Sequence, residues 1–171
     1  MGAIFRNLAL TLCSILIFLG VFEIFLRGWG YKIVTFYADA GFYQYDPDLG
    51  WEQIPNYEAK FRARDFEVNI KTNAYGLRDQ EYAFSKKQGI NRIIVLGDSF
   101  AWGWGVEQNE IFCEVAEHEL NGFEFINLGN NGYGTGQEYL IFEKLGRRFS
   151  PDLTVLAFYA NDVSDNNSAS D

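Results

Sequence analysis

The chain has few of the residues that bind metals or form disulfide bonds. Its 171 residues include one histidine, His118, and two cysteines, Cys13 and Cys113. No group of cysteines and histidines has the spacing of metal ligands, so we expect no metal site, zinc included. Cys13 lies in an apolar N-terminal run and Cys113 in a predicted helix far along the chain. We therefore expect two free thiols.

Positive charge is also scarce. Fourteen lysines and arginines stand against 23 aspartates and glutamates, which gives a formal net charge of −9. So acidic a chain is repelled by a phosphate backbone, and we expect no nucleic-acid partner. The composition is 48% hydrophobic and 18% aromatic, too apolar for a disordered chain. The length allows one domain and a tether.

A long apolar run lies near the N-terminus, at residues 8–26. About 20 apolar residues in a helix cross the hydrocarbon core of a bilayer. A cleaved signal peptide would have a shorter apolar core and a small-x-small cleavage site, and a lipoprotein signal would have small residues before Cys13. A buried soluble helix would not be apolar on all faces.

An uncleaved anchor fits this run best, so we predict a transmembrane helix within residues 1–28. The chain would then be a single-pass membrane protein whose soluble domain we expect outside the cytoplasm. Positive charges flank the run on both sides, at Arg6 and at Arg27 and Lys32. The charge distribution therefore leaves the orientation open.

Residues 29–88 predict an aromatic-rich extension of strands and loops. Turn signals occur at residues 46–50 and 54–56, and the apolar–polar alternation of residues 66–72 predicts a half-buried strand. Some residues here could approach a site, although turn and packing roles are the expected ones. These are Asp46, Trp51, Asn73 and Arg78.

Residues 89–171 alternate between strand and helix patterns, which favours a parallel sheet with right-handed crossovers. The predicted strands are 92–96, 123–128 and 153–159, and the predicted helices are 110–120 and 136–149. A doubly wound sheet normally has about five strands. We therefore predict an α/β fold: a flavodoxin-like three-layer sandwich with a parallel sheet, incomplete at its C-terminus and preceded by the transmembrane helix.

Each predicted strand ends in residues suited to acyl transfer. Ser99 follows the first strand, Gly132 lies in the glycine-rich segment after the second, and Asn161 follows the third. The carboxyl ends of parallel strands meet at one edge of a sheet. A serine hydroxyl can attack a carbonyl, while a glycine N–H and an asparagine amide can donate to the oxyanion that forms. The pattern predicts one site at this edge.

This pattern resembles the SGNH/GDSL hydrolase superfamily, in its membrane-anchored bacterial subset. Gly97-Asp98-Ser99 matches the first block, Gly132 the glycine of the second and Asn161 the asparagine of the third. The resemblance implies a serine ester hydrolase that needs no cofactor and acts on a small-molecule or glycan ester through an acyl-enzyme. Ser99 would be the nucleophile, and its N–H would form the oxyanion hole with Gly132 and Asn161. Asp98 would be a structural partner.

Two features depart from the family pattern. Tyr159 stands where the third block usually has glycine, and no Asp-x-x-His motif follows. In the family that motif supplies the general base, without which a serine hydroxyl is a weak nucleophile. His118 is flanked by carboxylates in a predicted helix, so we expect it on the solvated surface. We therefore expect this chain to be the N-terminal part of the hydrolase domain and close to inactive alone.

Two other functions remain open. The chain could be a non-catalytic, membrane-tethered binding module, or a protein related to glycan O-acyltransferases that passes the acyl group to a sugar hydroxyl.

Trp102 and Trp104 could line a cleft or cover the sheet edge. The glycines after residue 128 do not have Gly-x-Gly-x-x-Gly spacing, so we expect no dinucleotide.

Overall fold

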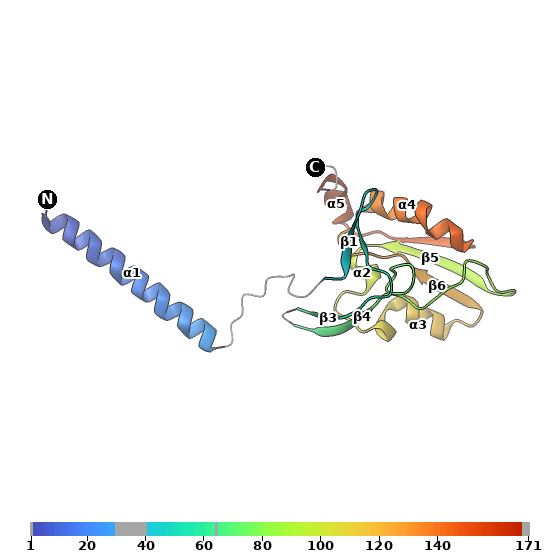
Figure 1. The fold of residues 1–171 in the computed structure, drawn as a ribbon, viewed down its shortest axis with the longest axis horizontal. Helices are drawn as coiled ribbons and strands as arrows, with labels where there is room; N and C mark the ends of the chain where they lie inside the picture. Colours follow the sequence, from blue (N-terminus) through green and yellow to red (C-terminus); the bar gives the residue numbers. More distant parts are fainter. Residues whose placement is uncertain (1, 30–40, 64, 169–171) are drawn as a thin grey trace. The chain divides into compact units, whose positions relative to one another are not determined.

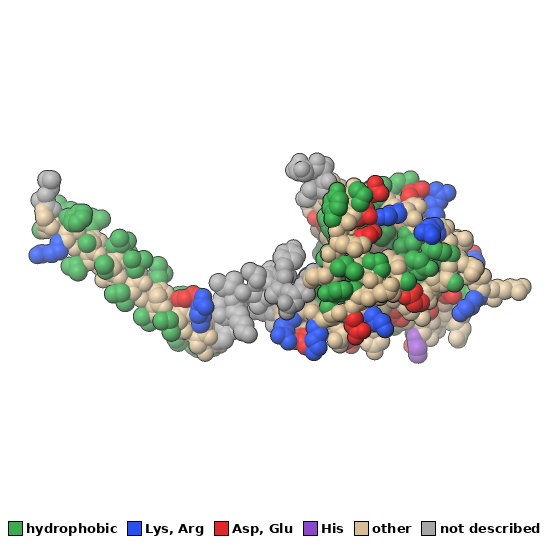
Figure 2. All heavy atoms as spheres, in the orientation of Figure 1, with side chains coloured by type: hydrophobic (Ala, Val, Ile, Leu, Met, Phe, Trp, Pro, Cys, Tyr) green, Lys and Arg blue, Asp and Glu red, His purple; other side chains and the backbone are tan. Residues whose placement is uncertain are grey.

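The computed structural model describes residues 2–29, 41–63 and 65–168, and the chain divides into two compact units, 1–36 and 37–171. The first unit contains α1 (Gly2–Gly28), whose apolar side chains are exposed along the whole helix (Figure 2). Its best 18-residue window has a mean hydropathy of 2.4. α1 is therefore long and apolar enough to cross a membrane, although a signal sequence near an N-terminus shares these properties.

A three-stranded parallel sheet lies at the centre of the second unit, in the order β6-β5-β7 (Figure 1). Its strands are β5 (Asn91–Gly97), β6 (Phe123–Asn127) and β7 (Leu153–Ala157). In the register of the sheet, Ile94 of β5 faces Ile126 on one side and Thr154 on the other. The predicted mixed α/β fold with a parallel sheet is confirmed at this level.

Helices cover both faces of the central strand. The larger ones are α3 (Phe112–Glu119) and α4 (Thr135–Lys144). A 3-10 turn at Gly146–Phe149 follows α4. The shorter ones are α2 (Ser99–Trp102), α5 (Asp162–Ser168) and a 3-10 turn at Gln108–Glu110. Figure 1 shows α3 and α4 on opposite sides of the sheet. The predicted helices at 110–120 and 136–149 match these two elements.

Successive side chains of β5 enter two different cores. Ile94 packs in a cluster that contains Ile141 of α4. Its neighbour Val95 packs in a second cluster, which contains Cys113 of α3. This burial on both faces is what an uninterrupted β-branched run predicts. Cys13 and Cys113 are both free thiols, Cys13 exposed and Cys113 buried.

Two antiparallel hairpins precede the sheet and belong to the same compact unit. The first pairs β1 (Tyr43–Asp46) with β2 (Gly50–Gln53), and the second pairs β3 (Glu58–Arg62) with β4 (Glu67–Lys71). Only β4 was expected from the sequence. Phe61 and Ile70 of the second hairpin pack around Trp102 of α2 in a third core cluster. The extension is thus joined to the sheet through α2.

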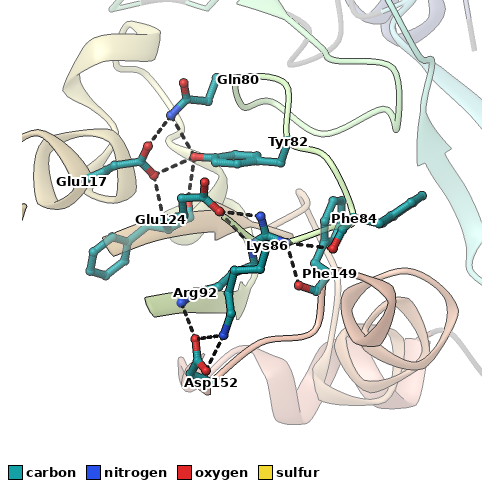
Figure 3. A network of polar contacts seen from close by, with 10 residues as sticks. Gln80, Tyr82, Phe84, Lys86, Arg92, Glu117, Glu124, Phe149 and Asp152 are labelled. Atoms are coloured by element: carbon teal, nitrogen blue, oxygen red, sulfur yellow. Dashed lines mark hydrogen bonds and ion pairs between the residues drawn. The ribbon is translucent and has the colours of Figure 1, made fainter. Parts of the chain in front are cut away.

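A buried arginine, Arg92, lies at the start of β5, the central strand of the sheet (Figure 3). Arg92 of β5 is 1% exposed, and its Nε and Nη2 donate to Glu124 Oε2 of β6 at 2.8 and 2.5 Å. Its Nη1 donates to the carbonyls of Phe84 and Phe149 at 3.2 and 2.7 Å. Burying a charge is tolerated only when its polar groups find partners. Arg92 therefore fixes β5, β6 and the segments before β5 and β7 in one arrangement.

We expect Arg92→Met to lower the free energy of unfolding by about 3–5 kcal/mol, because Glu124 would be left buried and unpaired. Lys60→Met is the matched control, since the Lys60 side chain is 68% exposed beside Glu67 and such pairs contribute little. Urea unfolding followed by tryptophan fluorescence measures both. Equal losses in the two variants would contradict this account of the network.

Candidate functional site

Ser99 is the first residue of α2 and directly follows the end of β5. Its side chain is partly exposed. Asp98 caps the helix, with its Oδ1 accepting from the Phe100 N–H at 2.9 Å. The N–H groups in the first turn of a helix have no carbonyl partner within it. The turn therefore places the Ser99 hydroxyl and the Ser99 N–H together at the carboxyl end of the central strand.

The loop after β6 lies directly against α2. A Cβ placed on Gly129 would lie 2.6 Å from the Trp102 backbone nitrogen and 2.8 Å from the Ala101 carbonyl carbon. The Asn130 N–H donates to the Gly97 carbonyl at 3.1 Å. The two strand ends are therefore in backbone contact, and glycine at position 129 is what allows it.

Asn127, at the end of β6, holds this contact from beneath. Its Nδ2 donates to the Ala101 carbonyl at 2.7 Å, and its Oδ1 accepts from the Gly129 N–H at 2.9 Å. The Asn127 N–H donates in turn to Asp79 Oδ2 at 2.7 Å. Burial raises the pKa of Asp79 well above its ordinary value, against the effect of that hydrogen bond. Asp79 is not among the residues singled out from the sequence, where its only signal is its place beside Arg78.

Gly132 is exposed and has a φ of +74°, which favours glycine. A Cβ at this position would lie 3.5 Å from Trp51 Cζ2. Trp51 also donates from Nε1 to the Asn131 carbonyl at 3.2 Å, and its own carbonyl accepts from the Tyr133 hydroxyl at 2.6 Å. Trp51 of β2 therefore shapes the glycine-rich loop.

Asn161 connects the end of β7 to the end of β5. Its Nδ2 donates to Asp98 Oδ2 at 3.0 Å and to Asp165 Oδ2 at 2.8 Å, while its Oδ1 is buried without a partner. The structure thus brings Asn161 to the residue next to Ser99. Both hydrogens of its amide are engaged by carboxylates, so an oxyanion at Ser99 would have to compete with them.

Two carboxyls that interact with each other and with Asp98 are buried. They are Glu138 of α4, which is 1% exposed, and Asp162 of α5, which is 0% exposed. Burial raises the pKa of Glu138 to about 7, and the charges of Asp162 and Asp98 act in the same direction. Burial likewise raises the pKa of Asp162 above its ordinary value. Asp162 Oδ2 accepts from the Tyr159 N–H at 3.1 Å.

Arg78 has a packing role. It is 1% exposed, and it donates from Nη1 to the Gly103 carbonyl and from Nη2 to the Val106 carbonyl, both at 2.6 Å. Its guanidinium lies 4.5 Å from the centroid of the Trp102 ring. Burial lowers the pKa of Arg78 to about 10. The buried Arg78 guanidinium therefore fixes the loop after α2 through its hydrogen bonds to two backbone carbonyls.

The other residues singled out from the sequence are structural. Trp102 is fully buried and donates to Gln53 Oε1 at 2.8 Å, while Trp104 is 38% exposed. Asp46 and Asn73 accept backbone N–H groups within their own turns. The His118 side chain is 87% exposed, as predicted, and is the purple side chain in Figure 2.

No family model matches this chain, and no curated protein matches it either. Within residues 2–29, 41–63 and 65–168, no three histidine, cysteine, aspartate or glutamate side chains are grouped so that they could hold a metal ion.

We expect Gly129→Ala to destabilise the protein by roughly 1–3 kcal/mol, because the new methyl group meets backbone atoms that cannot rotate away. Gly136→Ala is the control, since its Cβ would lie 3.4 Å from the Asn166 side chain. Thermal unfolding by circular dichroism compares the two variants. A Gly129→Ala protein as stable as wild type would show that the loop is not tightly packed on α2.

Proposed function

We propose that the carboxyl edge of the sheet is an ester-hydrolase site of the SGNH/GDSL type, with Ser99 as the nucleophile. One observation carries the proposal. Ser99 begins α2 at the end of the central strand, while its neighbour Asp98 is hydrogen-bonded at 3.0 Å to Asn161 at the end of β7. Residues 63 positions apart are thus joined by a hydrogen bond next to Ser99, and this contact supports the proposal.

In the proposed reaction, the Ser99 Oγ attacks the ester carbonyl carbon and gives up its proton to a base. The carbonyl oxygen becomes an oxyanion, which the N–H groups of Ser99 and Gly132 would stabilise, together with the Asn161 amide once it turns from a carboxylate. Collapse of this intermediate breaks the bond to the leaving oxygen, which takes the proton back from the base and departs as the alcohol, leaving an acyl-enzyme. Water then hydrolyses the acyl-enzyme, which releases the acid and restores the Ser99 hydroxyl. A glycan hydroxyl in place of water would give the transferase variant.

The proposed reaction needs a general base to take the Ser99 proton. Among the residues that the structure describes, the histidine is on α3 and 87% exposed, which does not suit it to activate a serine. We therefore infer slow turnover by this chain alone. We further propose a complete flavodoxin-like sandwich as the working domain, with α1 as its membrane anchor and small-molecule or glycan esters outside the cytoplasm as substrates.

A second candidate is a non-catalytic, membrane-tethered binding module. The observation that favours it is the engagement of both Asn161 amide hydrogens by Asp98 and Asp165, which leaves the amide without a hydrogen for an oxyanion. A site of this kind would bind a neutral ester or alcohol without cleaving it. Reaction of Ser99 with an acyl-transfer probe distinguishes the two candidates.

A fluorophosphonate probe is expected to label Ser99 slowly, and faster in concentrated imidazole, because the added imidazole can act as the general base that a serine hydroxyl needs. Peptide mass spectrometry identifies the modified residue. Ser99→Ala should abolish the adduct, and Ser85→Ala, at an exposed position, should leave it unchanged. No Ser99 adduct at any imidazole concentration would refute the nucleophile and favour the binding module.

Without imidazole, the purified chain is expected to hydrolyse p-nitrophenyl acetate no faster than its Ser99→Ala variant, since an unactivated hydroxyl is scarcely ionised at neutral pH. Stopped-flow absorbance of p-nitrophenolate measures both proteins. A burst that depends on Ser99 would mean that a base is already present, and the inference of slow turnover would then be wrong.

A further inference from the structure

Glu138 and Asp162 are buried carboxyls with oxygens that have no hydrogen-bond partner. Glu138 lies in the first turn of α4 and is 1% exposed, yet neither of its carboxylate oxygens has a hydrogen-bond partner. Asp162 begins α5 and is 0% exposed, and its Oδ1 is also without a partner. α4 and α5 pack together, and Asn166 Oδ1 of α5 accepts from the Gly136 N–H of α4 at 2.8 Å.

Among the residues that the structure describes, the charges that act on these two groups are acidic. Glu138 interacts with Asp162 and with Asp98, and Asp162 interacts in turn with Asp98 and Asp165. A buried carboxylate without a hydrogen bond or a counter-ion is strongly disfavoured, and two neighbouring carboxyls cannot both ionise without cost. One proton on the pair removes one negative charge. It also supplies an O–H that can donate to one of the carboxyl oxygens that otherwise have no hydrogen-bond partner.

We propose that Glu138 and Asp162 share one proton, and that this proton holds α5 against α4. Loss of this proton leaves two negative charges between α4 and α5 and loosens α5 from α4. Asn161 directly precedes α5, so the hydrogen bond from Asn161 to Asp98 loosens with it. The edge of the sheet beside Ser99 is therefore closed at acidic pH and opens as the pH rises. This device does not depend on Ser99 being a nucleophile.

The sign follows from the direction of the pKa shift. Because the pKa of Glu138 is raised to about 7 in the folded chain, the folded chain binds this proton more tightly than the unfolded chain does. The stabilisation is complete below the ordinary glutamate pKa and is lost as the pH rises through about 7.

The first test is amide hydrogen exchange by mass spectrometry on the full chain in detergent micelles at pH 5.5 and pH 8, corrected for intrinsic chemical rates. We expect α5 to exchange at least tenfold faster at pH 8 than at pH 5.5, since each unit of pKa shift corresponds to a factor of about ten and the pKa of Glu138 is raised from 4.5 to about 7. Glu138→Gln keeps the shape and removes the charge, so it should abolish most of this difference.

Glu143→Gln is the matched control, because Glu143 is on the same helix but pairs at the surface with Arg147. It should leave the pH response of α5 unchanged. A response that persists in Glu138→Gln, or that disappears equally in Glu143→Gln, would overturn the proposal.

The second test needs no Gln variant at Glu138 and reads the proton directly. Carbon-13 NMR of glutamate carboxyls should show one group that titrates near pH 7, and Asp162→Asn should move its midpoint toward the ordinary glutamate value. If every glutamate carboxyl titrates in the ordinary range, or if Asp162→Asn leaves the high midpoint in place, the shared proton is refuted. Neither test uses ester hydrolysis, so failure here is distinct from failure of the proposed enzymatic function.

Discussion

The position of α2 depends on Arg78. A helix of four residues cannot hold its own shape in water, because forming the first turn costs more than one hydrogen bond returns. α2 is fixed instead by the Asp98 cap at its start and by the buried Arg78 guanidinium, which binds the Gly103 and Val106 carbonyls beyond its end. Arg78 in turn depends on the surrounding carbonyls, since they are what makes its burial tolerable.

It follows that the two hairpins are part of the site's framework. Trp102 stacks on Phe42 with ring centroids 5.7 Å apart, and it donates to Gln53 at the end of β2. Trp51, also of β2, bonds the loop that carries Gly132. Neither hairpin lies among the strand ends where the chemistry was expected. Both nevertheless determine where the backbone on either side of Ser99 runs.

The central sheet was predictable because its signals are local. The run at 93–96 is apolar without interruption, and such runs end where the chain leaves the sheet. β1 was missed because three of its four residues are at least partly exposed and the strand shows no clear alternation; its pairing with β2 depends on the Asp46 turn. The link between Asn161 and Asp98 could be anticipated only as nearness at one sheet edge. The orientation of an amide toward two carboxylates is set by packing that no sequence pattern encodes.

β7 has a consequence for how the protein behaves in concentrated solution. It lies at the edge of the sheet, and Leu153, Val155 and Leu156 are 54%, 40% and 45% exposed, so both of its faces are open to solvent. Protected edge strands usually carry a lysine, a proline or a bulge that discourages further pairing, whereas β7 is Leu-Thr-Val-Leu-Ala. An uncovered strand of this composition is a template for β-addition between molecules. In the complete sandwich proposed above, a further strand would pair with this edge and cover it, whereas copies of the 171 residues alone would pair with one another there.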